Sequence, residues 1–304
     1  MDSSDSESTS STSSALSLTV NSSLIFPSKA EFLKTYLRQA FSLPDSIMHY
    51  MAMNPPSAEV YQKLIQSCKY FFVKNSILVL PSYYEINGWG TMVNGELKDI
   101  DLSNNPSKLW ITDTFNLIKS DNTIASSIIS KIYQCNVKNL QLHCQIITYD
   151  EFLILAPAVE HLSFAGVVVK YDDGTIVLFE KLVEQLPKVK KICLFLAGSE
   201  MITSKTIKEL LKIPHFTTLD SFSLYTIPEV FDIESYYVHI KKNKCTKICL
   251  QFCYGISEEY KTRLEAIVDE IIGANNREYK TPYITFGGLN FAKILKLNAL
   301  CLEQ

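Results

Sequence analysis

A six-residue pattern recurs through the C-terminal two-thirds of this 304-residue chain. Apolar residues occupy its first, fourth and sixth positions, and the last two are spaced as on one face of a strand. Clear copies begin at five positions: Val137, Val159, Val189, Leu219 and Cys245. Looser copies begin at Pro106 and Thr281. The fourth positions of successive clear copies lie 22 to 30 residues apart, which is typical of chains built from one repeated strand-and-helix unit.

Amphipathic helical patterns lie between the copies. Thr148 and Glu151 have the spacing of a capping box, in which a hydroxyl and a carboxylate satisfy free backbone N–H groups. Asp232 and Ser257 precede two further helical patterns as candidate N-caps. Apolar residues at helical spacing over 176–186 predict another helix. Strands that alternate with helices through short loops predict an α/β fold with a parallel sheet, because parallel neighbours need crossover connections.

Two architectures place parallel strands in this way. A doubly wound sheet has helices on both faces and usually a glycine-rich turn after an early strand. The chain has 10 glycines and no such turn. A solenoid repeats a short strand with the helix always on the same side, which explains the recurring pattern. We therefore expect residues 76–304 to form an irregular β/α solenoid whose apolar pattern residues point inward.

The expected solenoid resembles a leucine-rich-repeat array, whose repeats are about 20 to 29 residues long. Such repeats carry asparagine or cysteine three residues after the last apolar position. The corresponding residues here are Gln145, Val167, Ala197, Ile227 and Cys253. Because only Cys253 fits, we expect the other turns to lack the usual hydrogen bonds from side chain to backbone. Irregular curvature should follow.

The N-terminal part of the chain divides into a tail and a helical module. Residues 1–27 are rich in serine and threonine and carry acidic residues, so we expect a disordered tail. Residues 28–75 contain three short amphipathic patterns. The first begins with a capping box at Ser28 and Glu31, and the second spans 43–52. The third spans 57–72, with Ser57 as N-cap after the break at Pro55-Pro56.

Residues 42–75 of this module resemble an F-box. The resemblance rests on Leu43-Pro44 followed by Ile47, a short proline break, and a leucine-containing helix that ends in serine and aromatic residues. Two features depart from the family pattern. The segment 53–56 replaces the usual leucine between helices, and phenylalanine at 71 or 72 replaces the terminal tryptophan. The whole sequence is similar to divergent nematode-type F-box proteins, in which such a segment precedes a weak leucine-rich array.

This resemblance implies a non-enzymatic substrate-recognition adaptor of a cullin–RING (SCF-type) ubiquitin ligase. The helical module would bind the Skp-type adaptor, and the solenoid would hold an unidentified target protein. The implied adaptor contacts include Leu43, Pro44, Ile47, Met51, Leu64, Cys68 and Phe71. One alternative stays open, in which the helices only cap the sheet edge and the chain is a free-standing leucine-rich-repeat-like interaction module.

The target would bind the outward side of the predicted strands, where residues between and just after the inward apolar positions lie. This face is nearly uncharged and carries a few aromatic side chains, which suits the binding of a protein segment. The candidate target-binding residues are Trp110, Gln141, His143, Ser163, Phe195, Ser223, Tyr225 and Gln251. A partly covered sheet face is the alternative interpretation.

Several functional classes find no support in the sequence. It contains no phosphate-binding loop, nucleophile elbow, dinucleotide fingerprint or zinc-protease motif, so we expect no enzyme and no cofactor. Cys245, Cys249 and Cys253 would lie about 13 Å apart along a strand, too far to share a metal ion. The net charge of −3 disfavours nucleic acid. The absence of a signal sequence or a long apolar stretch predicts a cytoplasmic or nuclear protein with no membrane contact.

Overall fold

The computed structural model describes residues 29–37, 39–85, 89–93, 95–100, 102, 105–118, 121–196, 200–274 and 278–302. The predicted tail, the predicted cap Ser28 and the repeat position Ala197 lie outside the described residues.

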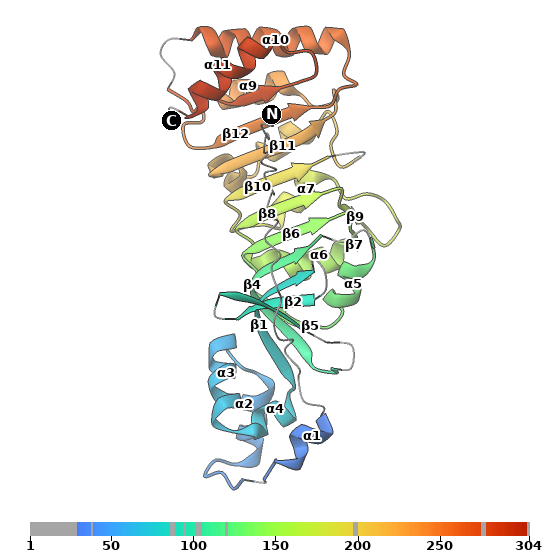
Figure 1. The fold of residues 1–304 in the computed structure, drawn as a ribbon, viewed down its shortest axis with the longest axis vertical. Coiled ribbons are helices and arrows are strands. Elements are labelled where there is room, and N and C mark those ends of the chain that lie inside the picture. The colour runs from blue at the N-terminus through green and yellow to red at the C-terminus, as the bar shows by residue number, and fades with distance from the viewer. Residues whose placement is uncertain are drawn as a thin grey trace, which may run out of the picture.

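A large, mostly parallel sheet dominates this mixed α/β fold (Figure 1). Its strands are β1 (Ile77–Glu85), β2 (Trp89–Val93), β3 (Glu96–Asp99), β4 (Lys108–Leu117), β5 (Ile132–Cys135), β6 (Asn139–His143), β8 (His161–Ala165), β10 (Lys191–Phe195), β11 (Ser221–Ile227), β12 (Lys247–Phe252) and β13 (Tyr283–Thr285). They pair in the order β3-β2-β1-β4-β6-β8-β10-β11-β12-β13, and β5 also pairs with β4. Among the described strands of this sheet, only β2 pairs in the antiparallel sense, with β1 and β3.

The five clear copies of the six-residue pattern supply β6, β8, β10, β11 and β12. These strands are consecutive parallel neighbours, so the predicted parallel sheet is confirmed. The two looser copies supply β4 and β13. The fourth and sixth residues of each copy are buried because alternation along each strand directs them to the same side, whereas the first residues Pro106 and Cys245 are exposed. A separate pair, β7 (Ile146–Thr148) and β9 (Val168–Lys170), lies beyond the ends of β6 and β8.

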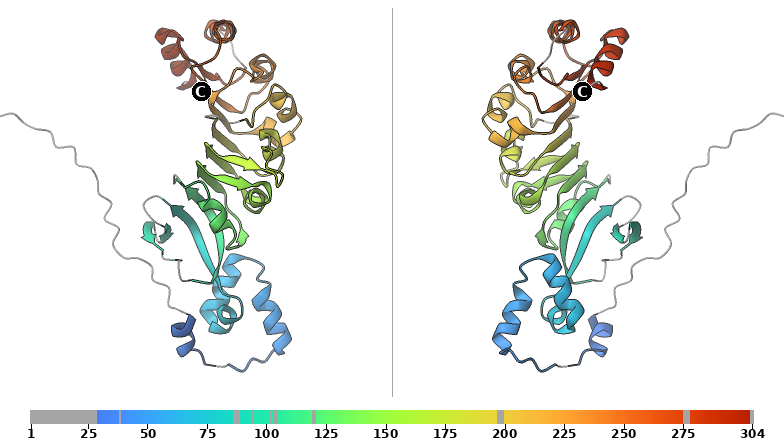
Figure 2. Two further views of the ribbon diagram at one scale, coloured as in Figure 1. Left: turned by 90° about the vertical axis from the view of Figure 1, so that its right-hand side faces the viewer. Right: turned by 90° about the vertical axis from the view of Figure 1, so that its left-hand side faces the viewer.

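Helices cover one side of the sheet, as Figure 2 shows for α6 to α9. The crossover helices are α5 (Ile124–Ile129), α6 (Tyr149–Leu155), α7 (Phe179–Glu184), α8 (Thr206–Leu210), α9 (Ile233–Ile240) and α10 (Glu258–Gly273), with short 3₁₀ turns at Ala156–Ala158 and Pro214–Thr218. The capping box of Thr148 and Glu151 is confirmed, as are the N-caps Asp232 and Ser257. The predicted helix over 176–186 is shorter than expected, because Ile176 instead forms a bridge to Lys170.

One expectation about the turns is wrong. Gln145 is fully buried, and its amide bonds backbone groups of the preceding segment. Its Oε1 accepts a hydrogen bond from the Ala125 N–H at 3.0 Å, and its Nε2 donates to the Asp121 carbonyl at 2.9 Å. A glutamine amide has the same donor and acceptor as asparagine on a longer arm, so it makes the bonds that were expected to be missing.

In the described part of the chain, four short helices precede the sheet: α1 (Lys29–Lys34), α2 (Asp45–Met53), α3 (Ala58–Ser67) and α4 (Lys69–Lys74). Ser57 caps α3 as predicted. The predicted third helix is divided at Cys68, whose extended backbone interrupts it. The thiol of Cys68 then caps α4 by accepting a hydrogen bond from the Tyr70 N–H. The helix predicted over 43–52 begins at Asp45, with Pro44 as its N-cap.

A small apolar cluster of Tyr61, Ile77 and Trp110 joins α3 to the sheet. The Tyr61 hydroxyl accepts a hydrogen bond from the Ile77 N–H at 3.1 Å and donates one to the Asn75 carbonyl. Burial raises the pKa of Tyr61 to about 12, so the hydroxyl stays protonated and keeps both bonds at neutral pH. The chain therefore connects its helices and its sheet through a packed, hydrogen-bonded junction.

Candidate protein-binding face

The side of the sheet opposite the crossover helices presents three rows of side chains across β6, β8, β10, β11 and β12. The rows exist because neighbouring parallel strands pair residue for residue and side chains alternate between faces. The basic row contains Asn139, His161, Lys191, Ser221 and Lys247. The small-residue row contains Gln141, Ser163, Cys193, Ser223 and Cys249. The aromatic row contains His143, Ala165, Phe195, Tyr225 and Gln251.

Seven of the eight candidate target-binding residues fall into these rows, and each is half-buried or exposed. The structure therefore brings Gln141, Ser163 and Ser223 together in one row. It brings His143, Phe195, Tyr225 and Gln251 together in the next. Trp110 is the exception and corrects the prediction. Its side chain is 1% exposed within the junction, and its Nε1 donates a hydrogen bond to Asn136 at 2.6 Å. It holds α3 to the sheet and cannot contact a target.

Two stacked rings dominate the aromatic row. Phe195 and Tyr225 lie on adjacent strands, with ring centroids 4.3 Å apart and planes inclined by 12°. Phe195 remains 47% exposed. Burial, followed by the neighbouring Cys249, raises the pKa of Tyr225 to about 12. The pair is thus a neutral, rigid aromatic surface, which is the kind of anchor that carries binding energy in protein interfaces.

The small-residue row is uncharged at neutral pH. Burial raises the pKa values of Cys193 and Cys249, so both thiols stay protonated. A protonated thiol is a poor nucleophile and a poor metal ligand. Within the described part of the chain, no three His, Cys, Asp or Glu side chains are close enough together to hold a metal ion. The row offers small side chains with weak hydrogen-bonding groups that allow a chain to approach the sheet closely.

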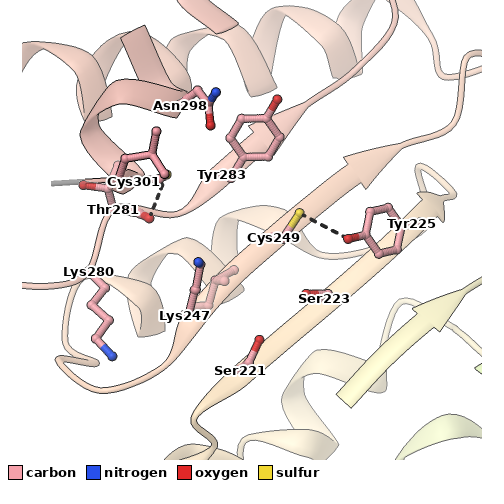
Figure 3. A pocket seen from close by; sticks show the side chains of 12 residues that line it. Ser221, Ser223, Tyr225, Lys247, Cys249, Lys280, Thr281, Tyr283, Asn298 and Cys301 are labelled. Carbon is pink, nitrogen blue, oxygen red and sulfur yellow. Dashed lines mark hydrogen bonds between the residues drawn. The ribbon is translucent and has the colours of Figure 1, made fainter. Parts of the chain in front are cut away.

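A cavity of about 490 Å³ lies where this face meets α11 (Phe291–Leu302). Figure 3 shows the strands β11 and β12 beneath it, with Tyr283 of β13 and Cys301 of α11 on another side. Its lining residues are Ser221, Ser223, Tyr225, Lys247, Ile248, Cys249, Lys280, Thr281, Tyr283, Asn298, Cys301 and Leu302. The sequence predicted Ser223 and Tyr225 as binding residues, but it did not predict most of the other residues that line this cavity. The helical spacing of Phe291, Leu295 and Leu302 could have predicted α11, the helix beside the cavity. All three side chains are exposed.

The N-terminal helices carry a second exposed surface, on α2. Leu43 and Ile47 are each 47% exposed and Tyr50 is 67% exposed. Pro44 is also exposed, and these residues follow the spacing of one helical face. Met51 and Leu64 are half-buried at the edge of the cluster beneath. We call Leu43, Pro44, Ile47 and Tyr50 the α2 patch.

Two implied adaptor contacts are corrected. Cys68 and Phe71 are buried, and they pack with Met48 and Ala52 inside the helical unit. Their apolar character therefore stabilises the α2–α4 contact and does not form the outer surface. Conversely, Tyr50 was not among the implied contacts, although it lies one helical turn from Ile47.

Comparison of the chain with protein-family models, with curated proteins and with solved structures finds no match. In the described residues, no helix combines the length and the apolar character that crossing a bilayer requires. The geometry of the two surfaces is therefore the basis for inferring function.

Proposed function

We propose that the chain is a non-enzymatic substrate-recognition adaptor of a cullin–RING (SCF-type) ubiquitin ligase. The α2 patch would bind the Skp-type adaptor, and the open sheet face would bind a target protein. The chain would act by bringing target and ligase together, which raises their effective concentration without any catalytic residue of its own. The observation that carries the proposal is the exposure of the α2 patch.

This exposure distinguishes the proposal from the alternative of a helical cap. A cap would bury the apolar face of its helices against the sheet, whereas a receptor must leave part of it accessible. Both kinds of surface occur here on different sides of the unit. Tyr61 is buried against Ile77 and Trp110, while Leu43 and Ile47 face outward on the other side. An apolar patch held away from the core in this way is typical of a protein-interaction site.

We also propose that the sheet and its crossover helices form an irregular leucine-rich-repeat-like solenoid. Successive pattern copies supply successive strands, and α6 to α9 lie on one side (Figure 2). The buried Gln145 makes side-chain bonds to the neighbouring backbone, as the asparagine of such repeats does. A solenoid of this kind leaves one long face of the sheet for a partner.

Co-purification of the full chain with a Skp-type adaptor tests the main proposal. We expect the wild-type chain to retain the adaptor and L43D or I47D to lose it, because a buried unpaired carboxylate opposes docking. Val238, which is exposed on α9 to a similar degree, offers a matched control. V238D should retain the adaptor. Failure of the intact chain to bind, or equal losses in all three variants, would contradict the proposal.

A further inference from the structure

We infer that the open sheet face binds an extended, acidic segment of the target protein. Carboxylates of that segment would lie at the basic row and in the cavity beside α11, and an apolar side chain would lie on the Phe195–Tyr225 pair. This inference names the class of target and rests on the assignment of the open face in the proposed function.

The charge of the cavity is the first argument. Lys247 and Lys280 line it, and none of the described lining residues is acidic. The Lys280 ammonium donates a hydrogen bond to the Cys245 carbonyl, which positions it while leaving further donors. Lys191 lies two strands from Lys247 in the same row, about 10 Å away. In the described chain, neither Lys191 nor Lys247 has a carboxylate within ion-pair distance.

Neighbouring carboxylates do not neutralise this charge. Glu160 accepts from Lys190 at 2.6 Å, and Glu278 accepts from Lys244 at 2.7 Å. Asp220 also acts on Lys190, whose pKa is raised first by Glu160 and then by Asp220. Glu160 and Glu278 are thus paired with other lysines, and no described carboxylate forms an ion pair with Lys191 or Lys247.

The remaining groups fit a peptide chain. Ser221, Ser223, Thr281 and Tyr283 also line the cavity and carry hydroxyls, which can hydrogen-bond carboxylates. The basic row and the aromatic row are four residues apart along each strand, or about 13 Å. An extended segment covers that distance in about four residues. The face therefore matches a segment with acidic residues about four positions from a large apolar residue.

Fluorescence anisotropy with the full chain tests this inference. The probe is a fluorescein-labelled peptide, Glu-Glu-Ser-Gly-Ser-Phe-Gly, and its control has glutamine in place of both glutamates. We expect the control to bind about tenfold more weakly, and binding of the probe to weaken as salt is added, because screening reduces exposed charge interactions. K247E should weaken binding of the probe by a similar factor. K208E, which changes an exposed lysine on α8, should not.

Three outcomes would overturn the inference. The first is equal binding of the glutamate and glutamine peptides. The second is binding only when serine in the probe is phosphorylated, because that would assign the face to phosphate. The third is binding of a labelled peptide of residues 1–28, which carries Asp2, Asp5 and Glu7, under conditions in which the probe itself does not bind. Adaptor co-purification with the same preparations separates the two proposals, since loss of probe binding with the adaptor retained removes only this one.

Discussion

Gln145 shows how one side chain can hold two neighbouring segments of the chain together. Its buried amide accepts from the N–H of Ala125 at the start of α5 and donates to the carbonyl of Asp121. The leucine-rich-repeat pattern did not predict this role, because it specifies asparagine or cysteine at this position. The physical requirement is a buried amide within reach of the preceding turn, and glutamine meets it.

Replacing Gln145 by leucine should therefore be costly. Loss of volume is not the cause, since leucine is similar in size to glutamine. The cost comes from leaving the buried Ala125 N–H without its acceptor. We expect Q145L to lower the free energy of unfolding by about 2 kcal/mol. Urea denaturation followed by circular dichroism measures this. The control Q141L changes a half-buried residue of the open face and should alter stability by less than about 0.5 kcal/mol.

Individual elements were predictable where the local pattern decides them. The strands β6, β8, β10, β11 and β12 follow from alternating apolar residues, and three helix starts follow from their caps. Elements that depend on distant partners were not predictable. The orientation of Trp110 is decided by β1 and α3, which cover it. Likewise, the cavity wall forms only because α11 lies beside β13, a contact that the spacing of residues does not encode.

The junction between α3 and the sheet depends on the Tyr61 hydroxyl. Y61F keeps the ring but leaves the Ile77 N–H without its acceptor, so the free energy of unfolding should fall by about 1–3 kcal/mol. Urea denaturation measures this change. Y50F is the matched control, because the Tyr50 side chain is largely exposed on α2. Equal stability of the two variants would show that the hydroxyl contributes nothing to the junction.

At the scale of the whole molecule, the N-terminal helices and the sheet with its crossover helices differ in the size of their hydrophobic cores. Most buried apolar residues belong to one cluster between the sheet and its crossover helices, whereas α2–α4 enclose a cluster of four buried residues. Regions with few buried contacts open at lower free energy. Amides of α2–α4 should therefore exchange with deuterium faster than amides of β8 to β12. Mass spectrometry after exchange measures this, and equal protection would contradict it.

The two ends of the sheet have a consequence for self-association. An edge strand is a template for another chain, and proteins commonly protect it by shortening it or by placing charges on it. The strand at one end, β13, has three residues and is followed by α11. The strand at the other end, β3, has four residues, of which Glu96, Lys98 and Asp99 are charged. Both edge strands of the sheet thus disfavour polymerisation by strand addition. Contact with another protein would then take place on the open face of the sheet.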